Sequence, residues 1–159
     1  MWTTLIAVIG TLSGVALAST TQIWADRRAR THQHRQDVAA AAAALLDAVL
    51  SYREIYWLRV DSIRGGEADP VDRAAVYRAR SEVTRARDRL ALATADPALI
   101  AAAEEAAWSA IDLSDVRLGA PSSGRFAAEV EEALDRGRER TRDAHTALRV
   151  AVTEYVHGQ

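Results

Sequence analysis

The chain contains neither cysteine nor lysine, so all twenty of its basic residues are arginine. Without cysteine it can form no disulfide framework, no thiolate zinc site and no cysteine nucleophile. Only three prolines and eight glycines interrupt 159 residues, which leaves long stretches open to helix. The net charge of −2 lacks the strongly basic balance of proteins that bind nucleic acid through bulk charge, so we expect no nucleic-acid partner.

Catalytic signatures are absent as well. The sequence holds no GxSxG nucleophile elbow, no P-loop, no dinucleotide-binding GxGxxG and no HExxH zinc motif. Glu104 with Glu105, or Asp112 with Asp115, could serve as general acid and base. Structural ion pairs are the commoner role of acids on an arginine-rich bundle, so we expect these acids to pair with arginines of the second helix. The sequence therefore predicts no enzyme and no cofactor.

The histidines are not spaced as the ligands of a metal site. His32 and His34 are the only close pair among four histidines, and on a helix their rings would point about 200° apart. A zinc site needs three or four convergent ligands. We interpret both histidines as solvated and expect no metal site.

The N-terminal segment, residues 1–25, has no charged side chain. A helix from Trp2 to Trp24 would rise about 33 Å, enough to cross a hydrocarbon core of about 30 Å with one indole at each interface. Arginines follow at once, and arginines beside a membrane helix tend to stay in the cytoplasm. We expect a single-pass anchor in the cell membrane, with the N-terminus outside and the C-terminal domain cytoplasmic. The arginines of this juxtamembrane stretch, residues 26–37, are Arg27, Arg28, Arg30 and Arg35.

A secretory signal peptide is the alternative interpretation of the segment. Residues 16–18 read Ala-Leu-Ala, the small-x-small pattern of a cleavage site. A signal peptide, however, begins with a positively charged region, and here only the α-amino group precedes the apolar run. The alternative predicts an exported helical binding domain, released by cleavage, whose mature chain begins at Ser19.

Small residues recur along this segment, with Gly10, Gly14 and Ala18 spaced by four. The two glycines form a GxxxG motif, which allows two membrane helices to approach closely. Glycine is also frequent in membrane helices without such a role. Association of the membrane helix into a homo-oligomer is therefore one of two hypotheses, and the other is that these glycines have no role in association.

Beyond residue 37 the hydrophobic pattern is helical nearly throughout, with breaks at residues 65–69, 95–96 and 119–124. Four helices are predicted. The first can continue from the membrane helix without a break, since no proline or glycine lies between Gln22 and Val38. Its apolar face is formed by Val38, Ala42, Leu45, Val49, Tyr52, Tyr56, Val60 and Ile63.

Asp-Pro pairs at residues 69–70 and 96–97 predict the starts of the second and third helices, because aspartate caps a helix and proline suits its first position. We expect the third helix to end just before Gly119 and the fourth to begin near residues 122–123. The predicted apolar rows are Val76, Ala79, Val83, Ala86, Leu90 and Ala93, then Ile100, Ala103, Ala107, Ile111, Ser114 and Leu118, then Phe126, Val130, Ala133, Gly137, Ala144, Leu148, Ala151 and Tyr155.

Short links make successive helices antiparallel neighbours. The expected fold class is all-α, an N-terminal transmembrane helix followed by an antiparallel four-helix bundle over residues 38–159. Alanine buries little apolar area, so the core should depend on its larger side chains. These are Leu45, Tyr52, Tyr56, Leu90, Trp108, Ile111, Phe126 and Leu148.

Large side chains cover all sides of one turn of the first helix at residues 55–58, Ile-Tyr-Trp-Leu, and the candidate surface comprises Tyr52, Ile55, Trp57 and Leu58. A helix with one buried face does not need this, so part of the turn can serve as a surface for a protein partner. The alternative is that the loop at residues 65–69 and the third helix cover it.

Four stretches of the sequence resemble short actinobacterial proteins of the KilB family. They are MWTTLIAVIGTL at residues 1–12, QHRQ at 33–36, YREIYWL at 52–58 and ARSEVT at 79–84. The resemblance implies a small membrane-associated protein linked to the spread of conjugative plasmids between mycelial compartments, with no catalytic residue carried over. We expect a non-catalytic scaffold or accessory protein that acts through contacts with the lipid bilayer and with an unknown protein.

Overall fold

A computed structural model describes the backbone of residues 2–67 and 72–158, and side chains for Gln22, Trp24 and residues 26–67 and 72–158. It divides into two compact units, residues 1–36 and 37–159. The described backbone of the first unit consists only of part of one helix. The second contains the parts of all four helices that share a core, and it begins one residue before the predicted bundle.

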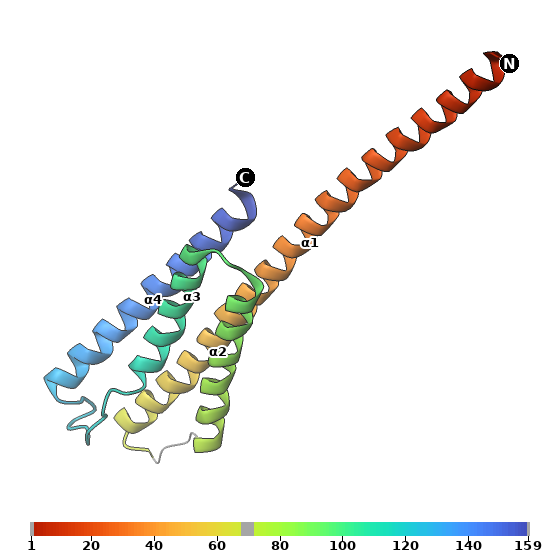
Figure 1. The fold of residues 1–159 in the computed structure, drawn as a ribbon. Coiled ribbons are helices and arrows are strands. Elements are labelled where there is room, and N and C mark those ends of the chain that lie inside the picture. The colour runs from red at the N-terminus through yellow and green to blue at the C-terminus, as the bar shows by residue number, and fades with distance from the viewer. Residues whose placement is uncertain (1, 68–71, 159) are drawn as a thin grey trace. The chain divides into compact units, whose positions relative to one another are not determined.

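The described residues confirm an all-α fold of four helices. Helix α1 spans Trp2–Arg64, α2 spans Arg73–Ala93, α3 spans Pro97–Leu113 and α4 spans Ala128–His157. Within residues 37–159 the four run alternately in opposite directions (Figure 1). This order makes α1 and α4, the first and last in sequence, lie beside one another in the bundle.

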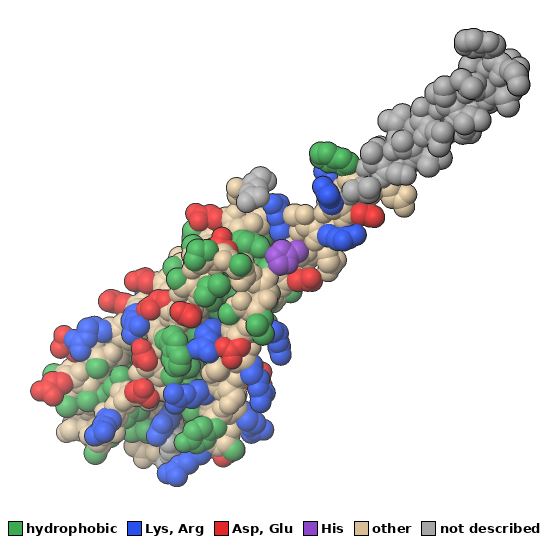
Figure 2. Space-filling view, viewed as in Figure 1, with side chains coloured by type: hydrophobic (Ala, Val, Ile, Leu, Met, Phe, Trp, Pro, Cys, Tyr) green, Lys and Arg blue, Asp and Glu red, His purple; other side chains and the backbone are tan. Residues whose placement is uncertain are grey.

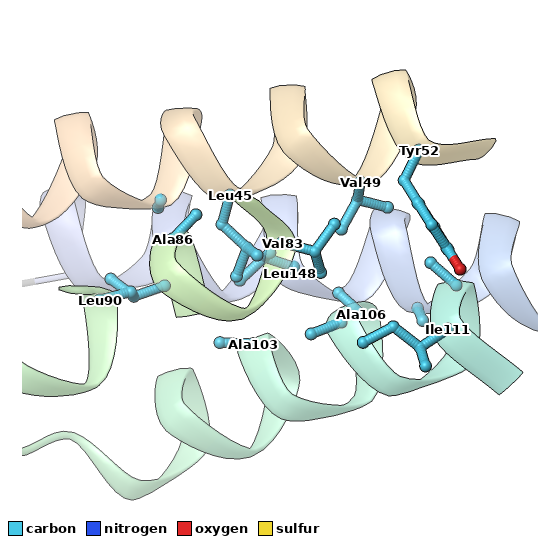
Figure 3. Close-up of a cluster of buried hydrophobic side chains, with 14 of the residues drawn as sticks. Leu45, Val49, Tyr52, Val83, Ala86, Leu90, Ala103, Ala106, Ile111 and Leu148 are labelled. Atoms are coloured by element: carbon cyan, nitrogen blue, oxygen red, sulfur yellow. The ribbon is translucent and has the colours of Figure 1, made fainter. Parts of the chain in front are cut away.

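The main core lies where the four helices meet within the bundle unit. Leu45 of α1, Val83 of α2 and Leu148 of α4 are all fully buried, and they point toward one another with small side chains of α3 beneath them (Figure 3). The predicted α1 row is confirmed from Val38 to Val60, since every member is buried. A 3.6-residue period is sufficient to find this face because α1 buries only one stripe.

A second cluster of buried side chains closes the end of the bundle near the α1 C-terminus. It joins Tyr56 and Val60 of α1 to Leu113, Phe126 and Leu134. Phe126 is buried as predicted, although it lies in the loop before α4 and not on the helix. The prediction for Trp108 was wrong, because its side chain is 43% exposed and lies under the Arg87 guanidinium, 5.2 Å from the ring centroid.

Several predicted helix boundaries were wrong. Helix α2 begins three residues later than expected, since Asp72 is its N-cap and accepts from the Ala74 N–H at 3.0 Å. Helix α3 ends at Leu113 and is capped by Ser114, well before Gly119. Helix α4 begins only at Ala128, because residues 122–125 form an isolated β-bridge turn. Local hydrogen bonds set these ends, and apolar periodicity does not report them.

The predicted start of α3 is confirmed, and it gives a first prediction. Asp96 caps the helix by accepting from the Leu99 N–H at 2.9 Å, with Pro97 at the first position. Asp96→Ala should lower the free energy of unfolding by about 1 kcal/mol. Urea unfolding followed by circular dichroism measures this, with Asp47→Ala on the exposed side of α1 as the control for loss of a carboxylate. Equal loss in both variants would show that the cap contributes nothing.

Among the residues whose side chains are described, no helix is both long and apolar enough to span a bilayer. The predicted anchor, residues 1–25, lies almost entirely outside them, since only Gln22 and Trp24 of that segment are included. The predicted association residues Gly10, Gly14 and Ala18 and the predicted interfacial Trp2 are likewise outside the described side chains.

Candidate functional site

The large side chains at the end of α1 differ in how deeply they are buried. Tyr52 is only 2% exposed and belongs to the core, where its hydroxyl donates to Ser114 Oγ at 2.7 Å. It is therefore not part of a partner surface. Ile55 is half-buried, whereas Leu58 is 57% exposed. Trp57 is half-buried as well, so Leu58 is the one exposed side chain of the four in the predicted surface.

Trp57 connects α1 to α4. The Arg138 guanidinium of α4 lies 4.2 Å from the centroid of the Trp57 ring, within the range of a cation–π contact. Tyr56 meets the same indole edge to face at 5.8 Å. Burial raises the pKa of Tyr56 to about 12, so this phenol stays protonated at neutral pH.

A polar pocket of about 440 Å³ opens beside this stack, lined by parts of α1, α4 and the loop before α4. Arg64 crosses one side of it, binding Glu131 at 2.7 Å and lying 5.5 Å from the Phe126 ring centroid. The other Glu131 oxygen accepts from the Phe126 N–H at 3.0 Å. Arg138 and Asp135 also line the pocket.

Basic side chains continue from this pocket along the contact between α1 and α4. We call them the basic seam, defined by Arg53 of α1 and by Arg138, Arg142, His145 and Arg149 of α4. The α4 members are spaced by four, three and four residues, which places them on one face of the helix. Because α1 and α4 run antiparallel and Trp57 faces Arg138, Arg53 one turn earlier on α1 faces Arg142 one turn later on α4.

The electrostatics of the basic seam agree with this register. Burial, followed by the positive charges of Arg142 and Arg138, lowers the pKa of Arg53. Burial, followed by Arg53 and Arg149, lowers the pKa of His145. None of the salt bridges between described residues involves a member of the seam. The seam arginines thus make no salt bridge among the described residues, although Asp135, Glu139 and Asp143 lie within one turn of Arg138 or Arg142 along α4.

Six other arginines of the bundle pair with acids in the described residues, namely Arg64, Arg78, Arg85, Arg87, Arg136 and Arg140. Arg140 on the α3 side of α4 binds Glu105 at 2.8 Å and Asp112 at 3.0 Å. The expected partner helix was therefore wrong for Glu105 and Asp112, which pair with α4 and not with α2, although their role as ion-pair partners is confirmed. On α2, Arg85 pairs with its neighbour Glu82. Figure 2 shows the resulting surface, with red side chains gathered over α4 and blue ones over α2.

The arginines of the predicted juxtamembrane stretch lie in the first unit. Trp24 is 71% exposed, and Arg27, Arg28 and Arg30 are exposed while Arg35 is half-buried. His32 and His34 are exposed too. Among residues whose placement is described, no three histidine or carboxylate side chains gather as a metal site would require.

Sequence comparison places the bundle in a family. The model of the KilB plasmid transfer protein family matches residues 38–156. The chain belongs to this family. Protein KilB of Streptomyces lividans is 40% identical over 85 residues, which are 54% of this chain and 56% of that protein. The chain thus spans about half the length of this KilB relative, and no solved structure matches.

The residues matched by the KilB family model coincide with the bundle unit, residues 37–159. What the chain shares with the family is therefore the four-helix core and its surfaces. Sequence reasoning missed the basic seam within it. The 4-3-4 spacing of its α4 members was a visible signal, but the position of Arg53 of α1 beside them becomes apparent only when α1 and α4 are placed together.

Proposed function

We propose that this chain is a non-catalytic accessory protein of plasmid transfer, held at the membrane by residues 1–25 and acting through contacts made by its cytoplasmic bundle. The observation that carries the proposal is the coincidence of the KilB match, residues 38–156, with the bundle unit. A bundle with an alanine-rich core and a surface of paired and unpaired arginines is suited to binding another molecule.

Membrane attachment rests on the sequence of the first unit. Residues 1–25 carry no charge, and four arginines follow within ten residues. Such a segment is long enough to cross the hydrocarbon core, and the arginines favour a cytoplasmic bundle. Their attraction to anionic headgroups adds about 1 kcal/mol each at the inner leaflet.

The test is protease access to a C-terminal tag on the full-length chain in intact spheroplasts, after alkaline extraction of the membranes. We expect the chain to resist extraction and the tag to be protected. Replacing Arg27, Arg28, Arg30 and Arg35 by glutamine should remove the orientation signal and give partly digested tag, while a variant with four bundle arginines replaced keeps the tag protected.

Two results would overturn the proposal. A tag digested in intact spheroplasts, on a chain that stays in the membrane, would place the bundle outside. A soluble chain whose first residue is Ser19 would establish the exported binding domain instead.

A further inference from the structure

Helices α1 and α2 carry opposite charges on their exposed sides. Within residues 37–64, every exposed charged side chain of α1 is acidic, whereas α2 contains six arginines and two acids. Asp47 and Glu54 lie seven residues apart on α1, and neither makes a salt bridge with a residue that the structure describes. Arg78 and Arg85 are likewise exposed and seven residues apart on α2. Equal spacing allows both acids to meet both arginines when two such helices pair side by side.

The two arginines have acidic neighbours within their own helix and its cap. Arg78 lies 3.9 Å from Asp72, and Arg85 lies 2.7 Å from Glu82. All four side chains are more than half exposed. Ion pairs in such positions contribute little to stability, so a carboxylate of another molecule can share or replace these neighbours.

The residues around these charges match as well. We define an α1 row and an α2 row, and all ten of their residues are exposed. Taken in opposite directions along the chain, the two rows have the same spacing. Antiparallel pairing therefore places each leucine over an alanine, each acid beside an arginine, and serine opposite serine. The α1 row is Ala40, Asp47, Ser51, Glu54 and Leu58, and the α2 row is Leu92, Arg85, Ser81, Arg78 and Ala74.

The fold holds the two rows at the same height in the bundle. Ile55 and Arg59 of α1 line a small cavity together with Val76 of α2. Because the helices are antiparallel, Ser81, five residues after Val76, is level with residues 50–54 of α1 and so with Ser51. A twofold axis parallel to the helices leaves every residue at its own height. Such an axis brings α1 of one copy onto α2 of another with the rows already in register.

We propose that the α1 row and the α2 row form the interface of a symmetric homodimer of the bundle. Each copy contributes both rows, so every contact occurs twice, and the α1 helices of the two copies run in the same direction. The short side chains of Ser51 and Ser81 at the centre allow the two helix axes to approach to about 8 Å. This interface is separate from the predicted association of the N-terminal helix, and it does not rest on a role in plasmid transfer.

The size of the interface indicates a weak dimer. Residues 40–58 and 74–92 each span about 27 Å of helix, and two helices side by side are about 20 Å wide. The two copies together therefore bury on the order of 1,000 Å², which is the lower limit for a specific interface. We expect a Kd of about 1 μM or weaker, so unfolding measured below that concentration reports on the single bundle.

Engineered disulfides test the contact, because the chain has no cysteine of its own. Full-length Ser51→Cys carrying a tag is mixed with untagged Ser81→Cys in neutral detergent and oxidised. A disulfide requires Cα atoms within about 7 Å, and only the Ser51–Ser81 contact between copies meets this condition. We expect the mixed disulfide dimer to form at least about fivefold faster than either homodimer.

Ala147→Cys on α4 is the matched control, since Ala147 is also small and exposed and lies outside both rows. Its mixture with Ser51→Cys should form disulfides only at the rate of random collision. Association through the N-terminal helix alone would bring copies together without favouring Ser51 and Ser81. Equal rates in the two mixtures would therefore overturn the proposal.

Charge reversal at one contact tests the ion pairs. Asp47→Arg in the Ser51→Cys chain brings two arginines together and should slow the mixed dimer about fivefold or more. Arg85→Glu in the Ser81→Cys chain should then restore the rate to within about twofold. The symmetric contact keeps Asp47 and Arg85, so the restoration reports on a single pair. Asp143→Arg on α4 makes the same change in net charge and should have no effect.

The second ion pair provides an independent test. Glu54→Arg, followed by Arg78→Glu in the other chain, should repeat the loss and the recovery, and it replaces the first pair if circular dichroism shows that an Asp47 or Arg85 variant is not folded. Raising NaCl from about 0.05 M to about 0.5 M should also slow the mixed dimer, since exposed charges are screened. The proposal fails if reversal at Asp47 and at Glu54 leaves the rate unchanged, or if neither paired reversal restores it.

Discussion

Replacing Leu90 by alanine is expected to lower the free energy of unfolding by about 2–5 kcal/mol, whereas the same change at Leu92 leaves it nearly unchanged. Both leucines lie on α2, two residues apart. Leu90 is 0% exposed and packs in the main core, and Leu92 is 88% exposed. The two substitutions remove the same atoms from the same helix, so the change in helix propensity is the same in both variants. The difference between their free energies of unfolding therefore measures the effect of burial.

The large expected loss at Leu90 follows from the composition of this core. Many of its members are alanines, including Ala86 on the same helix and Ala103 on α3. Each alanine buries little area, so apolar contact depends on the few leucines and valines between them. Small neighbours also have few rotamers with which to fill the space that Leu90 leaves, so a cavity should persist.

Thermal and urea unfolding of the two variants beside the parent chain give the measurement. Since the bundle unit contains more than one hundred residues, each 1 kcal/mol should change Tm by about 2–4 °C. Nearly equal loss at the two positions would mean that α2 is stabilised by its own propensity and not by the core. If the Leu90 variant does not fold, Val83→Ala, which removes less volume from the same fully buried face, provides the comparison.

The part of the fold that sequence predicts well is the part governed by one periodicity. Helix α1 buries a single row, and alternation of three and four residues finds it from Val38 to Val60. Helix α3 shows where this approach fails. In addition to members of its predicted row, this helix buries Leu99, Ala106, Ser109 and Ala110. An apolar helix packed by neighbours on more than one side has no single face for periodicity to detect.

The site was harder to predict for a different physical reason. The basic seam depends on how α1 and α4 are rotated about their own axes, which a hydrophobic period gives only approximately. The contact of Arg138 with Trp57 fixes that rotation, and it then places Arg53 beside Arg142. Sequence alone interpreted Trp57 as exposed or covered by a loop. It could not show that an arginine 81 positions later covers the ring.

Gly137 is expected to be the position on α4 least tolerant of a larger side chain. A Cβ atom there would lie 2.4 Å from Leu113 Cδ1, far inside van der Waals contact, and Leu113 is itself buried in the second cluster. Glycine inside a helix costs about 1 kcal/mol relative to alanine. Its presence in the middle of α4 therefore reflects the close approach of α3, and not a need for flexibility.

Gly137→Val should lower the free energy of unfolding by about 3 kcal/mol, at the upper end of the range for overpacking, because Leu113 has buried neighbours on its other sides. Gly119→Val is the matched control, since a Cβ at Gly119 would meet no atom within 4 Å, and its effect should be close to zero. Urea unfolding of both variants gives the values.

A double variant shows whether the clash is the cause. Leu113→Ala alone should destabilise by about 2–5 kcal/mol through cavity formation. Combined with Gly137→Val, it opens the space that the valine needs, so the loss in the double variant should be smaller than the sum of the two single losses by about 1 kcal/mol or more. Strict additivity would mean that Gly137 and Leu113 do not compete for the same space, and that the approach of α3 to α4 is set elsewhere. Sub-additivity would establish that this glycine fixes the distance between α3 and α4 at the end of the bundle where the loop before α4 begins.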